Sequence, residues 1–174
     1  MHLNSSAFDD YGKIPQRFTA DGENVSPALE WSDVPSGCKS LALLCEDLDA
    51  PKKSPQDPTF THWVVYNISP SISALHEGLE KKEELHDPLR IDQGMNSFGR
   101  VGYDGPKPPS GDLAHRYIFT LFALDIENLG PARAELKTIH DTMNNHILKT
   151  AQITGRYERQ RPAQQQSEEH RPSP

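Results

Sequence analysis

The amino-acid sequence predicts a single domain of mainly β structure with one helix near its C-terminus. Residues 40–46, 62–68 and 116–124 are rich in apolar, β-branched or aromatic side chains and are bounded by Pro, Gly, Asp or Ser, a pattern typical of strands. A later segment has the apolar period of an amphipathic helix. The 174 residues suit one hydrophobic core.

The three predicted strands differ in how they are expected to be covered. Residues 40–46 form a nearly continuous apolar run, which indicates a strand buried on both faces. Residues 62–68 carry Val64, Val65 and Tyr66, and residues 116–124 are similarly aromatic and β-branched. These two segments are therefore also predicted to be strands.

The helix is predicted from four apolar residues at spacings of three and four, Leu136, Ile139, Met143 and Ile147. Pro131 is expected to open it, because proline is tolerated in the first turn. Asn144 and Asn145 are expected to end it, since asparagine accepts a left-handed cap. Residues 147–157 are then expected to return as a strand.

Two long connections contain many prolines or glycines, residues 49–59 and 99–111. Long, stiff connections in a compact domain often build a site. The charged stretch 80–87 is expected to be a solvated excursion. Residues 1–159 are expected to form the domain, and residues 160–174 a disordered tail, because the tail has no apolar residue beyond Ala163.

Composition excludes several classes of function. The formal net charge is −7 and no dense Lys/Arg run is present, which argues against nucleic-acid binding. The longest apolar run is far too short to span a membrane. The N-terminus has no charged segment followed by an apolar one, so a cytoplasmic protein is expected.

The side chains that could carry chemistry lie at the ends of the predicted strands. Asp47 and Asp49 follow the first strand, His62 opens the second, and His115 and Tyr117 open the third. Strand alternation puts His115 and Tyr117 on one face. The same rule puts His62 on the face of Val64. If the three strand ends converge, these residues surround a cavity walled by prolines.

This group of residues leaves several interpretations open. A histidine and a tyrosine on one face can both donate to an oxyanion, and a carboxylate beside a histidine favours the imidazolium form. Asp47 and Asp49 could equally be turn-forming residues, and the histidines could be structural. An aspartate with two histidines could also bind a metal ion.

At these residues the sequence resembles the phosphatidylethanolamine-binding protein family, in particular its bacterial Raf-kinase-inhibitor-like branch. The strongest piece is Pro108-Pro109-x-Gly111-x-x-x-His115-Arg116-Tyr117. Further matching pieces lie at residues 26–31, 40–51, 62–68, 96–99, 102–106, 146–148 and 155–157. Two positions depart from the family pattern: Leu48 replaces a proline and Lys107 replaces a cysteine.

The resemblance implies a large central antiparallel sheet flanked by a smaller sheet and a few helices. It implies a small pocket for phosphate, phosphoryl head groups or carboxylates, formed by Asp47, His62, His115 and Tyr117. Asp49 and Pro51 would shape the first loop, and Pro108 and Pro109 the second. The family brings no firm catalytic activity, and we expect neither metal nor cofactor.

The resemblance also bears on partners. It implies a small phosphorylated or carboxylate ligand, a protein kinase or other signalling protein as a candidate partner, and a candidate homodimer. Two further functions are weighed against the anion-binding module. One is a metal-dependent hydrolase using Asp47, Asp49, His62 and His115. The other is an interaction protein whose pocket is vestigial.

The tail yields a first prediction. Truncation from Gln160 onward should leave the melting temperature almost unchanged, because these residues have almost no apolar surface to bury. Thermal unfolding of the full and truncated chains checks this. A large drop in melting temperature would show that the tail docks on the domain.

Overall fold

The computed structural model describes residues 1–52, 54–55, 58–86 and 90–160. They form two β-sheets and one α-helix, α1 (Leu136–Met143), with a short 3-10 helix at Gln16–Phe18. The large sheet has the strand order β2 (Gly12–Lys13), β10 (Ile147–Tyr157), β9 (His115–Leu124), β4 (Ser40–Asp47), β5 (Phe60–Ile68), β8 (Ile91–Gln93) and β7 (Glu84–Leu85). The small sheet has the order β1 (His2–Asn4), β3 (Leu29–Ser32) and β6 (Ala74–Leu75).

The predicted fold class is confirmed. The chain is mainly β, with a large sheet, a smaller antiparallel sheet and one α-helix among the described residues. Neighbouring strands of the large sheet run antiparallel except β2 and β10, which pair in parallel at the edge. The three strands expected from residues 40–46, 62–68 and 116–124 are β4, β5 and β9, and they lie side by side.

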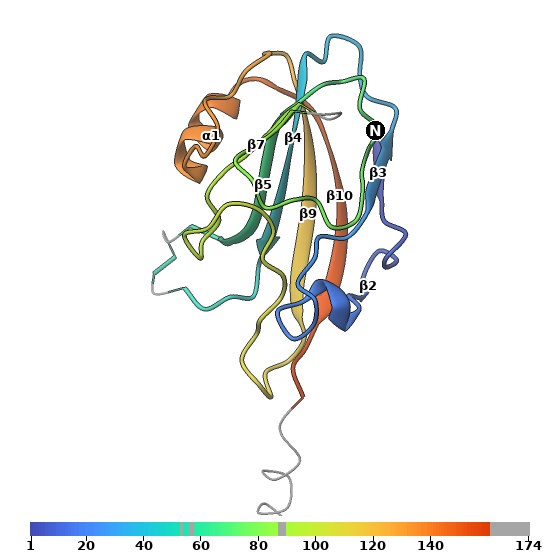
Figure 1. Ribbon diagram of the computed structural model, residues 1–174, viewed down its shortest axis with the longest axis vertical. Coiled ribbons are helices and arrows are strands. Elements are labelled where there is room, and N and C mark those ends of the chain that lie inside the picture. The colour runs from blue at the N-terminus through green and yellow to red at the C-terminus, as the bar shows by residue number, and fades with distance from the viewer. Residues whose placement is uncertain (53, 56–57, 87–89, 161–174) are drawn as a thin grey trace, which may run out of the picture.

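The large sheet separates two hydrophobic cores. One core packs side chains of β4, β5 and β9 against the small sheet, including Trp31, Trp63 and Phe119. The other packs the opposite face against α1 through Val64, Ile139 and others. The small sheet and α1 accordingly lie on opposite sides of the large sheet (Figure 1). Because β4 faces a core on both sides, a nearly continuous apolar run is what this strand requires.

The helix is shorter than predicted. It begins at Leu136 rather than Pro131, and Ile147 belongs to β10, where it is exposed. The reason lies before the helix, where Arg133 has a φ of 59°, a left-handed conformation that a right-handed helix excludes. The amide of Arg133 is instead held by the carbonyl oxygen of Gln93 at 3.0 Å. The strand predicted for residues 147–157 is confirmed as β10.

Short strands were not foreseen. The stretch 80–87, expected to be a solvated excursion, contributes β7 to the edge of the large sheet, with Glu84 paired to Asp92. Two or three residues carry too little periodicity for a strand to be predicted. The expected tail lies outside the described residues apart from Gln160.

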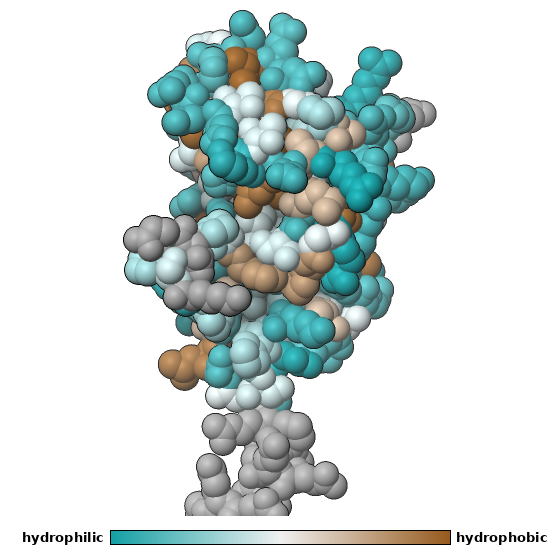
Figure 2. Space-filling model, turned by 90° about the vertical axis from the view of Figure 1, so that its left-hand side faces the viewer, coloured by the Kyte–Doolittle hydropathy of each residue, from teal (hydrophilic) through white to brown (hydrophobic). Residues whose placement is uncertain are grey.

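The outer surface of the α1 side is mostly hydrophilic, with apolar patches between the hydrophilic residues (Figure 2). Within the described ranges no helix is long and apolar enough to cross a membrane.

Candidate functional site

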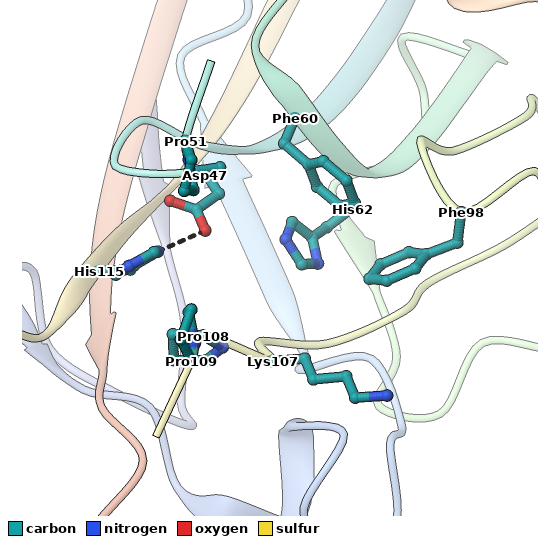
Figure 3. Close-up of a pocket in the computed structure, with 10 residues that line it drawn as sticks. Asp47, Pro51, Phe60, His62, Phe98, Lys107, Pro108, Pro109 and His115 are labelled. Atoms are coloured by element: carbon teal, nitrogen blue, oxygen red, sulfur yellow. Dashed lines mark hydrogen bonds and ion pairs between the residues drawn. The ribbon is translucent and has the colours of Figure 1, made fainter. Parts of the chain in front are cut away.

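The ends of β4, β5 and β9 meet at a cavity of about 350 Å³. Figure 3 shows Asp47 near two imidazoles, with aromatic and proline side chains around them. The lining residues are Asp47, Ala50, Pro51, Phe60, His62, Phe98, Lys107, Pro108, Pro109 and His115. The structure therefore brings three of the four predicted polar ligands to the wall of one cavity.

Asp47 and His115 form a buried pair. Asp47 lies opposite Tyr117 in the antiparallel register of β4 and β9, so the side chains of Asp47, Tyr117 and His115 share a face. His115 Nδ1 lies 2.8 Å from Asp47 Oδ2, and the other carboxylate oxygen accepts the amide of Asp49 at 2.9 Å. On its other side, His115 Nε2 lies 3.8 Å from Asp112 Oδ2.

His62 reaches this face through a β-bulge, which corrects the alternation predicted for β5. Cys45 pairs with Trp63, whereas the next residue, Glu46, pairs with Thr61. His62 is thus the extra residue on β5, and a bulge re-aims the side chain it carries. Its ring lies 5.2 Å from that of Tyr117 between centroids, while Val64 packs in the other core beside α1. His62 and Val64 therefore do not share a face.

The ring of His62 is fixed by one hydrogen bond and by aromatic contacts. Its Nδ1 lies 2.5 Å from the carbonyl oxygen of Asp104. Phe98 meets the ring edge-on at a centroid distance of 5.5 Å, and Phe60 lies at 5.2 Å. Burial lowers the pKa of His62 below its ordinary value, although the Asp104 carbonyl and the Asp47 carboxylate oppose this. The free protein therefore holds His62 as a neutral imidazole at pH 7.

Tyr117 lies behind the two histidines with its side chain fully buried. Its hydroxyl oxygen is, among the described residues, the one buried side-chain nitrogen or oxygen without a hydrogen-bond partner. Burial, together with the charge of Asp47, raises the pKa of Tyr117 far above its usual value, so the hydroxyl keeps its proton. An unsatisfied buried hydroxyl costs about 1–3 kcal/mol, which calls for an explanation.

The other predicted residues lie in two groups. Pro51, Pro108 and Pro109 line the cavity. Asp49 does not: it accepts hydrogen bonds from the backbone amide, Nε and a terminal nitrogen of Arg116, and so ties the loop after β4 to β9. The amide of Leu48, which a proline would lack, donates to the carbonyl oxygen of Arg116 at 3.1 Å.

Four residues at or near the cavity were not predicted as site residues from the sequence: Ala50, Phe60, Phe98 and Asp104. Phe60 opens β5 two residues before His62, so strand alternation could have indicated it. Asp104 lies in the connection 99–111 that was expected to build a site and Phe98 directly precedes it, but no spacing rule singles them out. Lys107, noted as a departure from the family pattern, lies on the cavity wall.

The described part of the chain contains no group of three or more His, Cys, Asp or Glu side chains arranged to hold a metal ion. Both oxygens of Asp47 are already bonded within the protein, to His115 and to Asp49. The geometry accordingly gives a metal-dependent hydrolase no support from these residues.

The chain matches the family model described as phosphatidylethanolamine-binding protein over residues 4–158. It belongs to the phosphatidylethanolamine-binding protein family. A UPF0098 protein of Methanothermobacter thermautotrophicus is 45% identical over 160 residues, covering 91% of this chain and 99% of that relative. A UPF0098 protein of Aquifex aeolicus is also 45% identical, covering 91% and 89%.

Two solved structures of the phosphatidylethanolamine-binding protein family resemble this one. A homologue from Chlamydia trachomatis is 37% identical with a TM-score of 0.79, covering 91% of this chain and 97% of its own. YbcL of Escherichia coli, described as a member of the mammalian family, is 31% identical with a TM-score of 0.81, covering 90% and 97%. Both share the fold along nearly the whole domain.

The close approach at Gly105 yields a second prediction. A Cβ atom at this position would lie 2.2 Å from the carbonyl oxygen of Phe18, so Gly105→Ala must move the wall that carries Pro108 and Pro109. We expect a loss of roughly 1–3 kcal/mol in the free energy of unfolding, measured by denaturant unfolding. Leu113→Ala, at an exposed position on the same connection, should change it by less than about 0.5 kcal/mol. Equal stabilities of the two variants would contradict this account of the wall.

Proposed function

We propose that this protein is a non-enzymatic binding protein whose cavity holds a phosphate-like or carboxylate anion. The observation that carries the proposal is the unpartnered hydroxyl of Tyr117, buried beside two histidines and next to the cavity. The carboxylate of Asp47 lies close to this hydroxyl but makes no hydrogen bond to it, so the protonated hydroxyl can donate to a ligand. Ligand oxygens would supply the missing hydrogen bond and recover part of the cost of leaving it unmade.

The histidines would supply the charge. A carbonyl oxygen can only accept, so His62 Nδ1 carries a hydrogen, and in the neutral ring Nε2 is then a bare acceptor. His115 Nδ1 is likewise engaged by the carboxylate of Asp47. Neutral rings would therefore offer lone pairs to a ligand, whereas an imidazolium donates a charge-assisted bond. Anion binding is thus expected to take up a proton.

The walls indicate what the anion is attached to. A water molecule occupies about 30 Å³ of liquid, so the 350 Å³ cavity exceeds the needs of a bare phosphate. Six of its ten lining residues are apolar: Ala50, Pro51, Phe60, Phe98, Pro108 and Pro109. A ligand with a charged head and a short apolar or aromatic group best fits a cavity with both polar and apolar walls. Lys107 adds a positive charge to the wall.

The predictions about larger partners stay predictions. Binding to a protein kinase or another signalling protein, formation of a homodimer and a cytoplasmic location are suggested by the family resemblance and by the N-terminal sequence. The anion cavity itself is the feature on which the experiments below act.

The hydroxyl of Tyr117 gives a third prediction, in which function and stability move in opposite directions. Tyr117→Phe should weaken the affinity for phenyl phosphate about tenfold, because a bond to a charged group is lost. It should leave the melting temperature unchanged or raised, because an unsatisfied buried hydroxyl is removed. Calorimetric titration and thermal unfolding measure the two quantities.

Tyr66→Phe is the matched control. Tyr66 is also a buried tyrosine of the large sheet, but its hydroxyl donates to the carbonyl oxygen of Pro131 and accepts the amide of Ala134, on the α1 side. This variant should lose stability and keep the affinity. A Tyr117→Phe protein that binds phenyl phosphate like the wild type would mean that Tyr117 is not a ligand.

The lowered pKa of His62 gives a fourth prediction. A bound anion raises this pKa again, so affinity is highest below the free-state pKa and falls as pH rises toward the bound-state pKa. Acetate stays ionised above about pH 5.5. Its affinity should fall between about pH 6 and pH 8, by at most about tenfold per pH unit for one proton. The slope should be smaller in His62→Ala. Calorimetry that shows an affinity independent of pH in the wild type would mean that the histidines do not carry the charge.

A further inference from the structure

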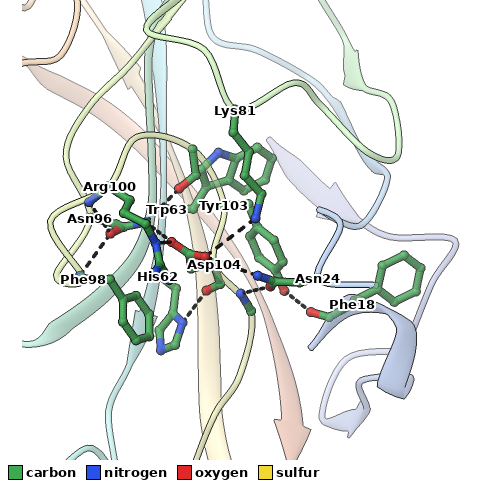
Figure 4. Close-up of polar contacts among 12 residues, drawn as sticks. Phe18, Asn24, His62, Trp63, Lys81, Asn96, Phe98, Arg100, Tyr103 and Asp104 are labelled. Carbon is green, nitrogen blue, oxygen red and sulfur yellow. Dashed lines mark hydrogen bonds and ion pairs between the residues drawn. The ribbon is translucent and has the colours of Figure 1, made fainter. Parts of the chain in front are cut away.

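Asp104, in the connection between β8 and β9, is a buried carboxylate whose side chain is 6% exposed. Four side chains converge on it, as Figure 4 shows: two from its own connection and two from more distant parts of the chain. Asn96 Nδ2 and Arg100 Nε lie 2.8 and 2.9 Å from one oxygen. Asn24 Nδ2 and Lys81 Nζ lie 3.2 and 3.6 Å from the other. Every partner is a donor, so only a carboxylate satisfies all four.

The backbone of Asp104 makes two hydrogen bonds to His62, one as an acceptor and one as a donor. The carbonyl oxygen of Asp104 accepts His62 Nδ1 at 2.5 Å, and the amide of Asp104 donates to the carbonyl oxygen of His62 at 3.1 Å. The next amide, of Gly105, donates to Asn24 Oδ1 at 2.7 Å. The side chain of Asn24 therefore bonds both to the Asp104 carboxylate and to the backbone amide of Gly105.

We propose that Asp104 is a positioning residue for the anion cavity. Its carboxylate, held by four donors, fixes the backbone of Asp104, and this backbone accepts the hydrogen on His62 Nδ1. The other ring nitrogen, Nε2, is then free to contact a ligand. This rests on the proposed anion-binding function. The hydrogen bond to Nδ1 decides the tautomer of a histidine, and a fixed tautomer leaves one defined nitrogen for the cavity. Asp104 does not line the cavity, so it acts through His62.

The electrostatics indicate that the Asp104 carboxylate stays ionised and keeps its four donors. Burial alone would raise the pKa of Asp104, but the hydrogen bonds from Arg100 and Asn96 and the charge of Lys81 hold that pKa below its usual value. The carboxylate therefore remains ionised at neutral pH and keeps all four donors. The charged or titratable groups around His62 are Asp104, Asp47 and Tyr117, with Lys107 on the same cavity wall.

The test compares Asp104→Asn with the wild type. An amide in place of the carboxylate turns one acceptor oxygen into a donor that faces other donors. The contacts with the four donors around residue 104 should therefore loosen, although the size of the side chain is kept. The first readout is the pair of ring ¹⁵N shifts of His62 in ligand-free protein near pH 8. We expect a single tautomer with hydrogen on Nδ1 in the wild type and a mixture of both tautomers in the variant.

The second readout is the affinity for inorganic phosphate, which should be about tenfold weaker in the variant. Asp125→Asn is the matched control. Asp125 is also a loop aspartate that bonds one histidine, His146, at 2.7 Å, but it follows the end of β9 opposite His115. This control should change neither the tautomer of His62 nor phosphate binding.

The readouts separate the possible outcomes. A folded Asp104→Asn protein with an unchanged His62 tautomer would overturn the proposal, whatever its melting temperature. If the variant does not fold, the wild type still decides, because hydrogen on Nε2 of neutral His62 would contradict the fixed tautomer. A wild type with the expected tautomer that binds no phosphate would refute the proposed function, but not the effect of Asp104 on His62.

Discussion

The register between β4 and β9, which sets Asp47 opposite Tyr117, is the constraint on which the site depends. It brings a carboxylate and a phenol to one face at the open end of the sheet, and strand alternation adds His115 to that face. The carboxylate then engages His115 Nδ1. A slip of one residue would turn all of these side chains into the opposite core, so the packing of the sheet interior also fixes the chemistry at its edge.

Two polar clamps hold the parts of the site that the register does not reach. Asp49 joins the loop after β4 to Arg116 by a bidentate pair and a backbone hydrogen bond. Asp104 joins the Gly-rich segment to β5 through His62. Neither carboxylate lines the cavity, so the polar groups on its wall are those of Asp47, His62, Lys107 and His115. The proposed anion site would need this stiffness, because a binding site costs less to occupy when its donors are already in place.

Local patterns predicted the three long strands, the strand at residues 147–157 and the identity of Asp47, His62, His115 and Tyr117 as residues at strand ends. They failed where the structure depends on distant pairing. The bulge that turns His62 toward Tyr117 exists only relative to β4, and Arg133 delays the helix through a contact with Gln93. The partners of Asp104 come from positions as far away as Asn24, which no short motif can encode.

A crystal structure grown with phenyl phosphate tests the central claim most directly. The account predicts the phosphoryl group inside the cavity, with one oxygen within hydrogen-bond distance of Tyr117 Oη and another near His62 Nε2, and the phenyl ring against Phe60 and Phe98. A phosphoryl group bound elsewhere, or one that leaves the hydroxyl of Tyr117 unpartnered, would contradict it.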